Sequence, residues 1–482
     1  PLEYYYYPED SSKVVPTYSY SKRMFDFLEY EIGVPYPWQN YKQVPVRDFL
    51  YAGMENTTLT IFSEAFVVDS LGFVDRNYVN VNAHELAHQW FGNLVTETEG
   101  THHWLHEGFA TYYALLAERE LFGEDYYYWK LLQSAEQLKA LSEQGKGQSL
   151  LDPGASSLTF YEKGAWALHI LKELIGEVAF KNAVTAYLNN HRYENVTTED
   201  FLREVRKAAV TDIASWEADW LRQTAFQSEQ AYASLMKSDF VRAYFEAKAL
   251  RLQPFSEKEG ALRDLLLNGN EYTGQEAVYQ LAEVPMKKAI PLYQLALESE
   301  HLLVRQAVAE SIPEIPNALK TGIEGMLEDG SYVSRELALS RLWEQFPNDR
   351  KRYLEATKYM EGFQNKNLKL LWLALAISSE AYGATANEIF VSELKTYASE
   401  RFSFEVRQLA FDYLIRLQIL DDEVMAHLIN GSVHHYWRFR DVARQVLDEM
   451  WKVESFKTRL IEVLETVPEE ERRYLRTKIE SE

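Results

Sequence analysis

The chain has 482 residues, of which 50 are Lys or Arg and 73 are Asp or Glu, so its formal net charge is −23 at pH 7. A chain of this length holds roughly two to four domains, and its acidity argues against nucleic acid as a partner because phosphates are repelled. The sequence has no cysteine, which excludes a disulfide framework and a thiolate site. No apolar run reaches the roughly 18 residues of a membrane span. A soluble protein of the cytoplasm, the periplasm or the exterior is expected, and the oligomeric state is not predicted.

The first elements are a helix and a pair of strands. Residues 1–20 are rich in Tyr and Pro and predict an extended lead-in. A helix is expected from Ser21 to about Ile32, where apolar residues recur at helical spacing until Gly33. Alternating apolar residues then predict strands on both sides of the segment Gly53-Met54-Glu55-Asn56. These residues are Val44, Val46, Phe49, Leu59, Ile61 and Phe66.

The segment 81–90 contains a zinc-hydrolase motif. His84 and His88 are one helical turn apart, and Glu85 lies beside them in the pattern HExxH. Zn²⁺ binds neutral imidazole nitrogens and carboxylate oxygens in a tetrahedral set and keeps one position for water. We expect His84 and His88 to be zinc ligands. Glu85 lies about 100° round the helix and is expected to act as the general base toward the bound water.

A third ligand is expected on the next helix, predicted over residues 105–122 with Gly123 as its end. Glu107 follows His88 after eighteen intervening residues and lies in the first turn of this helix. Two antiparallel helices joined by a polar loop would direct the Glu107 carboxylate at both histidines. A metzincin arrangement is excluded, because its glycine and third histidine would fall on Phe91 and Leu94. A second metal among the flanking His102, His103 and His106 is the less favoured alternative.

Further helices follow the metal motif. A helix is expected from Tyr161 to Ile175, ended by Gly176, and the segment Tyr161-Glu162-Lys163-Gly164 stands at its start. The other expected elements are a helical run from Trp129 to about Leu141, a turn at Asp152-Pro153-Gly154, and a helix over 198–209 with Thr197 and Asp200 as its capping box.

Taken together, these motifs resemble the M1 family of zinc aminopeptidases across residues 20–225. The resemblance implies an α+β thermolysin-like catalytic domain with one Zn²⁺ bound by His84, His88 and Glu107. It implies that Glu85 and Tyr161 are catalytic, with Tyr161 donating to the oxyanion. The implied substrate-binding residues are Gly53, Met54, Glu55 and Asn56, of which Glu55 holds the free α-amino group.

The sequence departs from the family pattern at some positions. Ala52 and Gly53 stand in the reverse of the family's commoner order, and His106 stands where relatives usually carry Asn. The N-terminal β-rich domain that precedes the substrate-binding segment in the family is expected to be absent from this chain. No strand-rich stretch of β-sandwich length follows Trp220. The β-sandwich domain of larger family members is therefore also expected to be absent.

The second half of the sequence is helical throughout and weakly repetitive. Basic residues enter apolar helices at intervals of 30, 34, 38 and 33 residues, namely Arg305, Arg335, Lys369, Arg407 and Arg440. This pattern predicts an all-α solenoid of HEAT/ARM-like helix pairs. The expected domains are a catalytic domain over 1–225, a linker over 226–250 and the solenoid over 251–482.

The function predicted from these motifs is that of a zinc-dependent aminopeptidase acting on peptides with a free N-terminus. An epoxide hydrolase of the leukotriene A4 hydrolase type is an alternative. It is disfavoured because Pro153 and Ser156 stand where that relative has Asp and Tyr. A protein-binding scaffold with a vestigial site is the least favoured reading, because every implied site residue is intact. The sequence predicts neither the preferred first residue nor a limit on peptide length.

Overall fold

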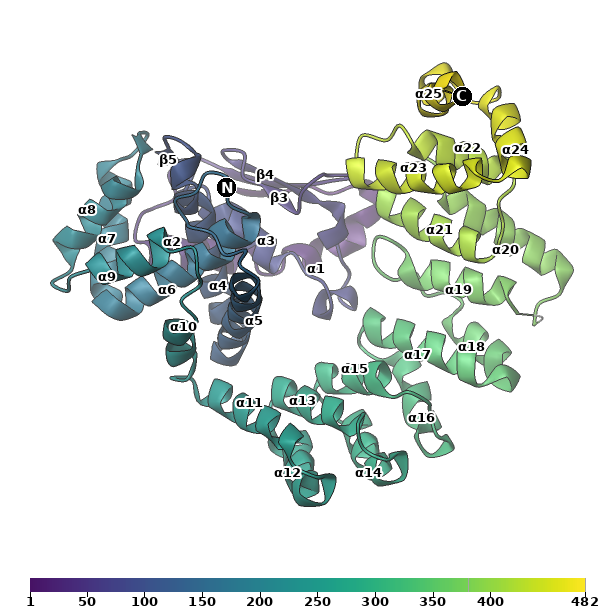
Figure 1. Ribbon diagram of the computed structural model, residues 1–482, viewed down its shortest axis with the longest axis horizontal. Helices are drawn as coiled ribbons and strands as arrows, with labels where there is room; N and C mark the ends of the chain where they lie inside the picture. The colour runs from purple at the N-terminus through teal and green to yellow at the C-terminus, as the bar shows by residue number, and fades with distance from the viewer. Residues whose placement is uncertain (380, 482) are drawn as a thin grey trace. The chain divides into compact units, whose positions relative to one another are not determined.

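The computed structural model describes residues 1–379 and 381–481, and the chain forms two compact units. The first unit contains residues 1–45, 51–62 and 77–252, and the second contains 46–50, 63–76 and 253–482. Helices α1 to α11 belong to the first unit and helices α12 to α25 to the second, with the labels of Figure 1. Residues 226–250, expected as a linker, form helices α10 and α11 of the first unit.

The strands of the first unit form a four-stranded sheet in the order β1-β2-β4-β3. Strand β1 is parallel to β2, and β3 is antiparallel to β4, with Met54 opposite Ile61. A second sheet pairs β5 with β6 in parallel, and no strand follows β6 in the described part of the chain. The strand bounds are Leu2–Tyr4 (β1), Tyr41–Val46 (β2), Gly53–Met54 (β3), Leu59–Ser63 (β4), Thr96–Glu97 (β5) and Asn195–Val196 (β6).

The prediction of an extended lead-in over residues 1–20 is only partly correct. The chain is extended at β1 and then forms a 3₁₀ turn and the short helix α1. Tyr18 of α1 is buried, packs edge-on against Phe62 and Tyr78, and donates a hydrogen bond to the Tyr5 carbonyl. These tertiary contacts stabilise a compact conformation that the local composition does not predict.

Helix α4 is the centre of the first unit. Nearly all of its first fifteen residues are buried, as expected for a helix that is covered on all sides. Figure 1 shows it among its neighbours, and it contacts α2, α3, α5, α6 and the π-helical turn η5. The helices and helical turns of this unit are η1 (Pro8–Lys13), α1 (Val14–Tyr18), α2 (Ser21–Ile32), α3 (Val79–Ala87), η4 (Gly100–His102), α4 (Trp104–Phe122), α5 (Glu124–Glu143), η5 (Thr159–Lys163), α6 (Gly164–Ile175), α7 (Glu177–Asn190), α8 (Thr198–Ala208), α9 (Ala214–Trp216), η6 (Glu217–Arg222), α10 (Ser228–Leu235), α11 (Asp239–Ala249) and η7 (Leu250–Leu252).

Most helix boundaries predicted from the sequence are confirmed. Helix α2 ends at Gly33, whose φ of 77° is the left-handed conformation that favours glycine. The capping box of Thr197 and Asp200 is present at the start of α8. Helix α5 begins at Glu124, earlier than the expected Trp129. Among the described residues, no helix is both long and apolar enough to cross a bilayer.

The second unit is built from helices that pack in chain order. Helix α13 contacts α15, α15 contacts α17, α17 contacts α19 and α19 contacts α21, while the intervening helices pack against their neighbours. The five repeated basic residues all lie in first turns, of α15, α17, α19, α21 and α23. The bounds are η2 (Glu64–Phe66), η3 (Gly72–Val74), α12 (Phe255–Asn268), α13 (Glu271–Leu281), α14 (Met286–Leu297), α15 (Leu302–Ser311), α16 (Asn317–Gly325), η8 (Met326–Glu328), α17 (Tyr332–Gln345), η9 (Pro347–Asp349), α18 (Arg350–Thr357), α19 (Asn367–Ile377), α20 (Ala384–Tyr397), α21 (Phe404–Arg416), α22 (Asp422–Gly431), α23 (Trp437–Trp451), α24 (Glu454–Leu464), η10 (Glu469–Glu471) and α25 (Arg473–Ser481).

Two short early segments belong to this helical unit. Asp48, in segment 46–50, accepts a hydrogen bond of 2.6 Å from the Phe404 N–H at the start of α21. Asp75, in segment 63–76, accepts from the Tyr332 N–H at 2.8 Å and from the Ser331 hydroxyl at 2.7 Å at the start of α17. Carboxylates at helix N-termini satisfy free N–H groups and complement the helix dipole. Both segments are therefore bound to helices several hundred residues away in sequence.

Candidate metal centre and substrate cleft

Helix α3 presents the two predicted histidine ligands on one face. His84 lies in its last turn and His88 directly after its end, and both side chains are buried. The His88 Nδ1 atom lies 2.9 Å from the Phe91 carbonyl. When Nδ1–H donates to this carbonyl, the lone pair of His88 is on Nε2, the atom that faces His84.

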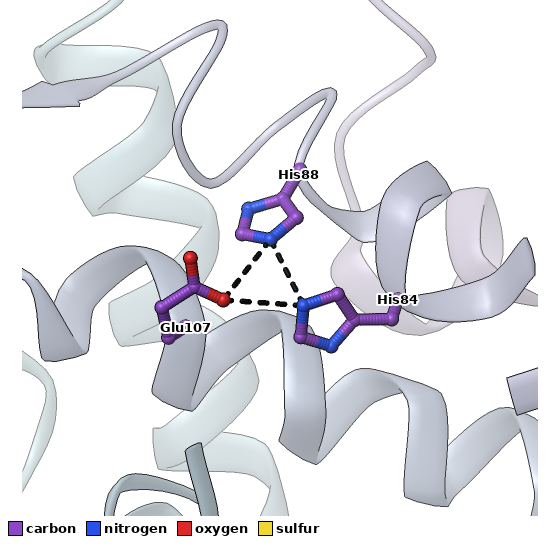
Figure 2. Close-up of side chains that lie close together, drawn as sticks. All are labelled: His84, His88 and Glu107. Atoms are coloured by element: carbon purple, nitrogen blue, oxygen red, sulfur yellow. Dashed lines mark hydrogen bonds and ion pairs between the residues drawn. The ribbon is translucent and has the colours of Figure 1, made fainter. Parts of the chain in front are cut away.

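Helix α4 runs beside α3 and places Glu107 opposite these histidines. The Glu107 Oε2 atom lies 3.2 Å from His84 Nε2 and 3.4 Å from His88 Nε2, and the two Nε2 atoms are 3.0 Å apart. Figure 2 shows the three side chains directed at one point. The structure thus brings together the three residues that the sequence predicts as ligands.

The donor atoms of this triad suit Zn²⁺. Two imidazole nitrogens and one carboxylate oxygen are the ligand types of catalytic zinc sites that leave one position open. Burial lowers the pKa of His84, which favours the neutral, ligating form of its ring. The pKa of Glu107 lies below its ordinary value because hydrogen bonds and charge from His84 and His88 outweigh the effect of burial. A divalent cation bound at this point would replace the shared protons that hold the three groups together.

Glu85 lies beside the triad. Its carboxylate, the Glu55 carboxylate and a His88 ring nitrogen offer atoms that all lie within 4.8 Å of one another. Burial, assisted by Glu55 and Glu107, raises the pKa of Glu85 to about 8 against the opposing charge of His88. Its Oε2 atom is buried and has no hydrogen-bond partner among the described residues. A carboxyl group in this state can accept and return a proton near neutral pH.

The Tyr161 side chain covers the triad from the π-helical turn η5. Its ring stacks on the His84 ring at a centroid distance of 5.3 Å and an interplanar angle of 5°. Burial raises the pKa of Tyr161. The Glu107 carboxylate, which accepts a hydrogen bond from the Tyr161 hydroxyl, raises this pKa further. Tyr161 therefore remains a hydrogen-bond donor throughout the neutral range.

Two glycines fix the distance between Tyr161 and Glu107. The position of a Cβ atom on Gly164 would lie 2.7 Å from the Gly108 Cα atom, and a Cβ on Gly108 would lie 3.0 Å from the Gly164 Cα atom. Only glycine at both positions allows α4 and the start of α6 to approach this closely. Each glycine is adjacent or nearly adjacent in sequence to a predicted site residue, so the contact sets the geometry of the site.

Strand β3 passes directly over Glu85. A Cβ atom on Gly53 would lie 2.6 Å from both Cγ and Cδ of Glu85, so glycine is required there. Gly53, Met54 and Glu55 line the same cleft as the triad. The Asn93 side chain donates a hydrogen bond of 2.7 Å to the Glu55 carbonyl, which ties this segment to the loop after α3. The side chain of Asn56 is exposed and does not line the cleft.

The cleft has a volume of about 750 Å³ and extends well beyond the predicted residues. Its further walls include Thr111, Leu115 and Glu118 of α4 and Lys130 of α5. Sequence analysis did not identify these four residues. The three on α4 follow Glu107 at helical spacing and so could have been found by extending its helix face, whereas nothing in the sequence indicates Lys130.

The histidines that flank Glu107 form a hydrogen-bonded network. The Glu97 N–H donates to His106 Nε2 at 2.8 Å, and Glu97 Oε1 lies 3.0 Å from His103 Nδ1. Burial lowers the pKa of His106 to about 4, so its ring is neutral and carries its proton on Nδ1. Both nitrogens of His106 are thus unsuited to a metal ion, although Glu97, His103 and His106 lie close enough to hold one.

Comparison with known proteins identifies relatives of the first unit. Residues 17–220, which include every predicted site residue, match the model described as the peptidase family M1 domain. The chain is 32% identical over 217 residues to Aminopeptidase M1 of Arabidopsis thaliana, covering 42% of this chain and 24% of that protein. It is 28% identical over 254 residues to Aminopeptidase N of Lactobacillus helveticus, covering 48% and 30%. The matches thus span less than a third of the length of these curated relatives.

Among solved structures, native yeast LTA4 hydrolase resembles the chain with a TM-score of 0.51 at 15% identity. The similarity covers 86% of this chain and 65% of that one. It shows a shared fold that includes a helical C-terminal part.

Proposed function

Residues 17–220 of this chain are a peptidase family M1 domain, and on that premise we propose that the protein is a zinc aminopeptidase that removes the first residue of peptides. The observation that carries this proposal is the convergence of His84, His88 and Glu107, with Glu85 and Tyr161 beside them in one cleft. The relatives named above are aminopeptidases by name. The cofactor is Zn²⁺, for which the donor set is suited.

In the proposed reaction, Glu55 selects peptides with a free N-terminus. Its carboxylate lies in the cleft next to Glu85 and can pair with an α-ammonium group. An acetylated or internal residue offers no such charge. Because the amine is fixed at Glu55, the first carbonyl group of the peptide is brought to the triad and the enzyme acts as an exopeptidase.

Glu85 and Tyr161 carry the proton transfers and the charge stabilisation. Zinc, when bound by the triad, supplies Lewis acidity that polarises the carbonyl and makes water acidic. Glu85 accepts the proton of the attacking water and later returns it to the leaving amine. The Tyr161 hydroxyl donates to the carbonyl oxygen as negative charge develops on it.

A panel of aminoacyl fluorogenic amides tests this proposal, with and without a chelator. Cleavage that requires zinc, with no cleavage of the N-acetylated forms, is the expected result. Catalysis that survives complete metal removal, or equal rates on acetylated substrates, would refute the proposal.

We also propose that residues 251–482 form a HEAT/ARM-like solenoid. Supporting this are the contacts between alternate helices from α13 to α21 and the placement of the repeated basic residues at their first turns. Such stacking lets each helix pair bury its apolar stripe against the next pair.

Epoxide hydrolysis remains the less favoured alternative. A structural neighbour is named LTA4 hydrolase, but Pro153 and Ser156 are exposed in this chain and neither lines the cleft.

A further inference from the structure

One face of α4 forms a wall of the cleft, and the side chains along it change in polarity with distance from the metal centre. Glu107, Thr111, Leu115 and Glu118 are spaced by four, four and three residues, and all four line the cleft. At 1.5 Å per residue, Glu118 lies about 16 Å along the helix from Glu107. The wall is polar at Thr111, apolar at Leu115 and acidic at Glu118.

At the far end of this wall, Glu118 is held by hydrogen bonds to the two neighbouring helices. Glu118 is buried, and its carboxylate accepts 2.8 Å from the Asn80 side chain of α3 and 2.9 Å from the Tyr126 hydroxyl of α5. The carboxylate has about four acceptor positions, so it can bind a further donor from the cleft.

The far end of this wall carries an excess of negative charge. Glu118 and Glu162 are two carboxylates that line it, and Lys130 is the cation whose charge acts on both. Burial raises the pKa of both carboxyl groups, and Lys130 opposes this effect. A second cation placed there would restore charge balance and favour the ionised form of both groups.

The hydroxyl of Thr111 gives an independent indication of a ligand. Thr111 is only 8% exposed, its side chain lines the cleft, and its Oγ1 atom has no hydrogen-bond partner among the described residues. Buried hydroxyls without a partner are costly. A polar group of a substrate that enters the cleft would supply one.

From these observations we propose that the cleft along α4 receives the side chain of the substrate's first residue and selects a long cationic one, arginine or lysine. The methylene stem lies on Leu115, and the charged head is directed at Glu118, which it reaches through a bridging water. A neutral or acidic side chain leaves the acidic end without a counterion. This inference rests on the proposed aminopeptidase function and adds its substrate class.

The test compares coumarin amides of arginine and citrulline, which have nearly the same length and shape but differ in charge. For the wild type we expect kcat/KM at least about tenfold higher for arginine, the effect of one charged hydrogen bond. Glu118→Gln should bring the ratio close to one, through a lower kcat/KM for arginine. Glu120→Gln, an exposed change on the same helix, should leave the ratio unchanged.

A second variant acts in the opposite direction and covers the case in which Glu118→Gln does not fold. Lys130→Gln should increase the ratio of arginine to citrulline, because it removes the competing cation. Equal rates for arginine and citrulline in the wild type, or a preference for the glutamate amide, would overturn the inference but leave the aminopeptidase proposal intact. If the zinc-loaded protein cleaves no aminoacyl amide, the proposed function fails and the inference fails with it.

Discussion

The substitution Gly53→Ala tests whether the close approach of β3 to Glu85 sets the catalytic geometry. The new methyl carbon would lie 2.6 Å from the Cγ and Cδ atoms of Glu85, whereas ordinary van der Waals contacts begin at 3.4 Å. The Glu85 Oε1 atom would lie closer still, so either β3 or the Glu85 carboxylate must move by at least the difference, 0.8 Å. Both movements change the position of Glu85 relative to the substrate amine and the carbonyl group.

A misplacement of about 1 Å can reduce the rate about 10²-fold, so we expect kcat/KM to fall by roughly this factor, equivalent to about 2.7 kcal/mol. The three atoms nearest to the added methyl group all belong to Glu85, which is not one of the three proposed ligands, so zinc content should remain one per chain. The measurements are steady-state kinetics on a free aminoacyl amide, metal analysis and circular dichroism.

The matched control is Gly154→Ala, where the added methyl would meet only Asp152 Oδ1, at 3.4 Å. It should leave kcat/KM unchanged within a few-fold. If Gly53→Ala binds zinc and retains the wild-type kcat/KM, the position of Glu85 does not depend on β3, and this reasoning is wrong.

Three further predictions concern single side chains of the site. Tyr161→Phe keeps the ring that stacks on His84, so zinc and KM should be retained while kcat falls about 10² to 10³-fold; a kcat within a few-fold of wild type would remove Tyr161 from the mechanism. Glu107→Ala should purify folded with far less than one zinc per chain, because one of three donors is lost, and metal analysis showing stoichiometric zinc with retained activity would contradict its assignment. Glu55→Ala should raise KM for free peptides more than it lowers kcat, and rapid cleavage of an acetylated peptide by the wild type would argue against the role of Glu55.

The convergence of His84, His88 and Glu107 could be predicted from the sequence because its geometry is mostly local. His84 and His88 are placed by helical spacing alone, and a single helix-to-helix contact adds Glu107. The ends of α2 and the start of α8 follow from Gly33 and the Thr197 capping box, which act within one turn.

The remainder depends on contacts between elements that no local pattern encodes. Lys130 reaches the cleft only because α5 packs beside α4, and the compact conformation of residues 1–20 depends on the burial of Tyr18 against Phe62. Similarly, the membership of segments 46–50 and 63–76 in the helical unit depends on carboxylates that bind helices more than 250 residues away.

These two segments constrain how the protein can be divided or recombined. The chain passes between its two units five times, after residues 45, 50, 62, 76 and 252. A fragment that ends at Leu252 would retain Asp48 and Asp75 but lose the Phe404 and Tyr332 N–H groups to which they are bonded. Residues 253–482 therefore cannot be exchanged alone as an independent domain, because the helical unit also contains segments 46–50 and 63–76. A recombination event that replaces these residues must also supply acceptable partners for Asp48 and Asp75, so the two parts of the chain are expected to evolve together.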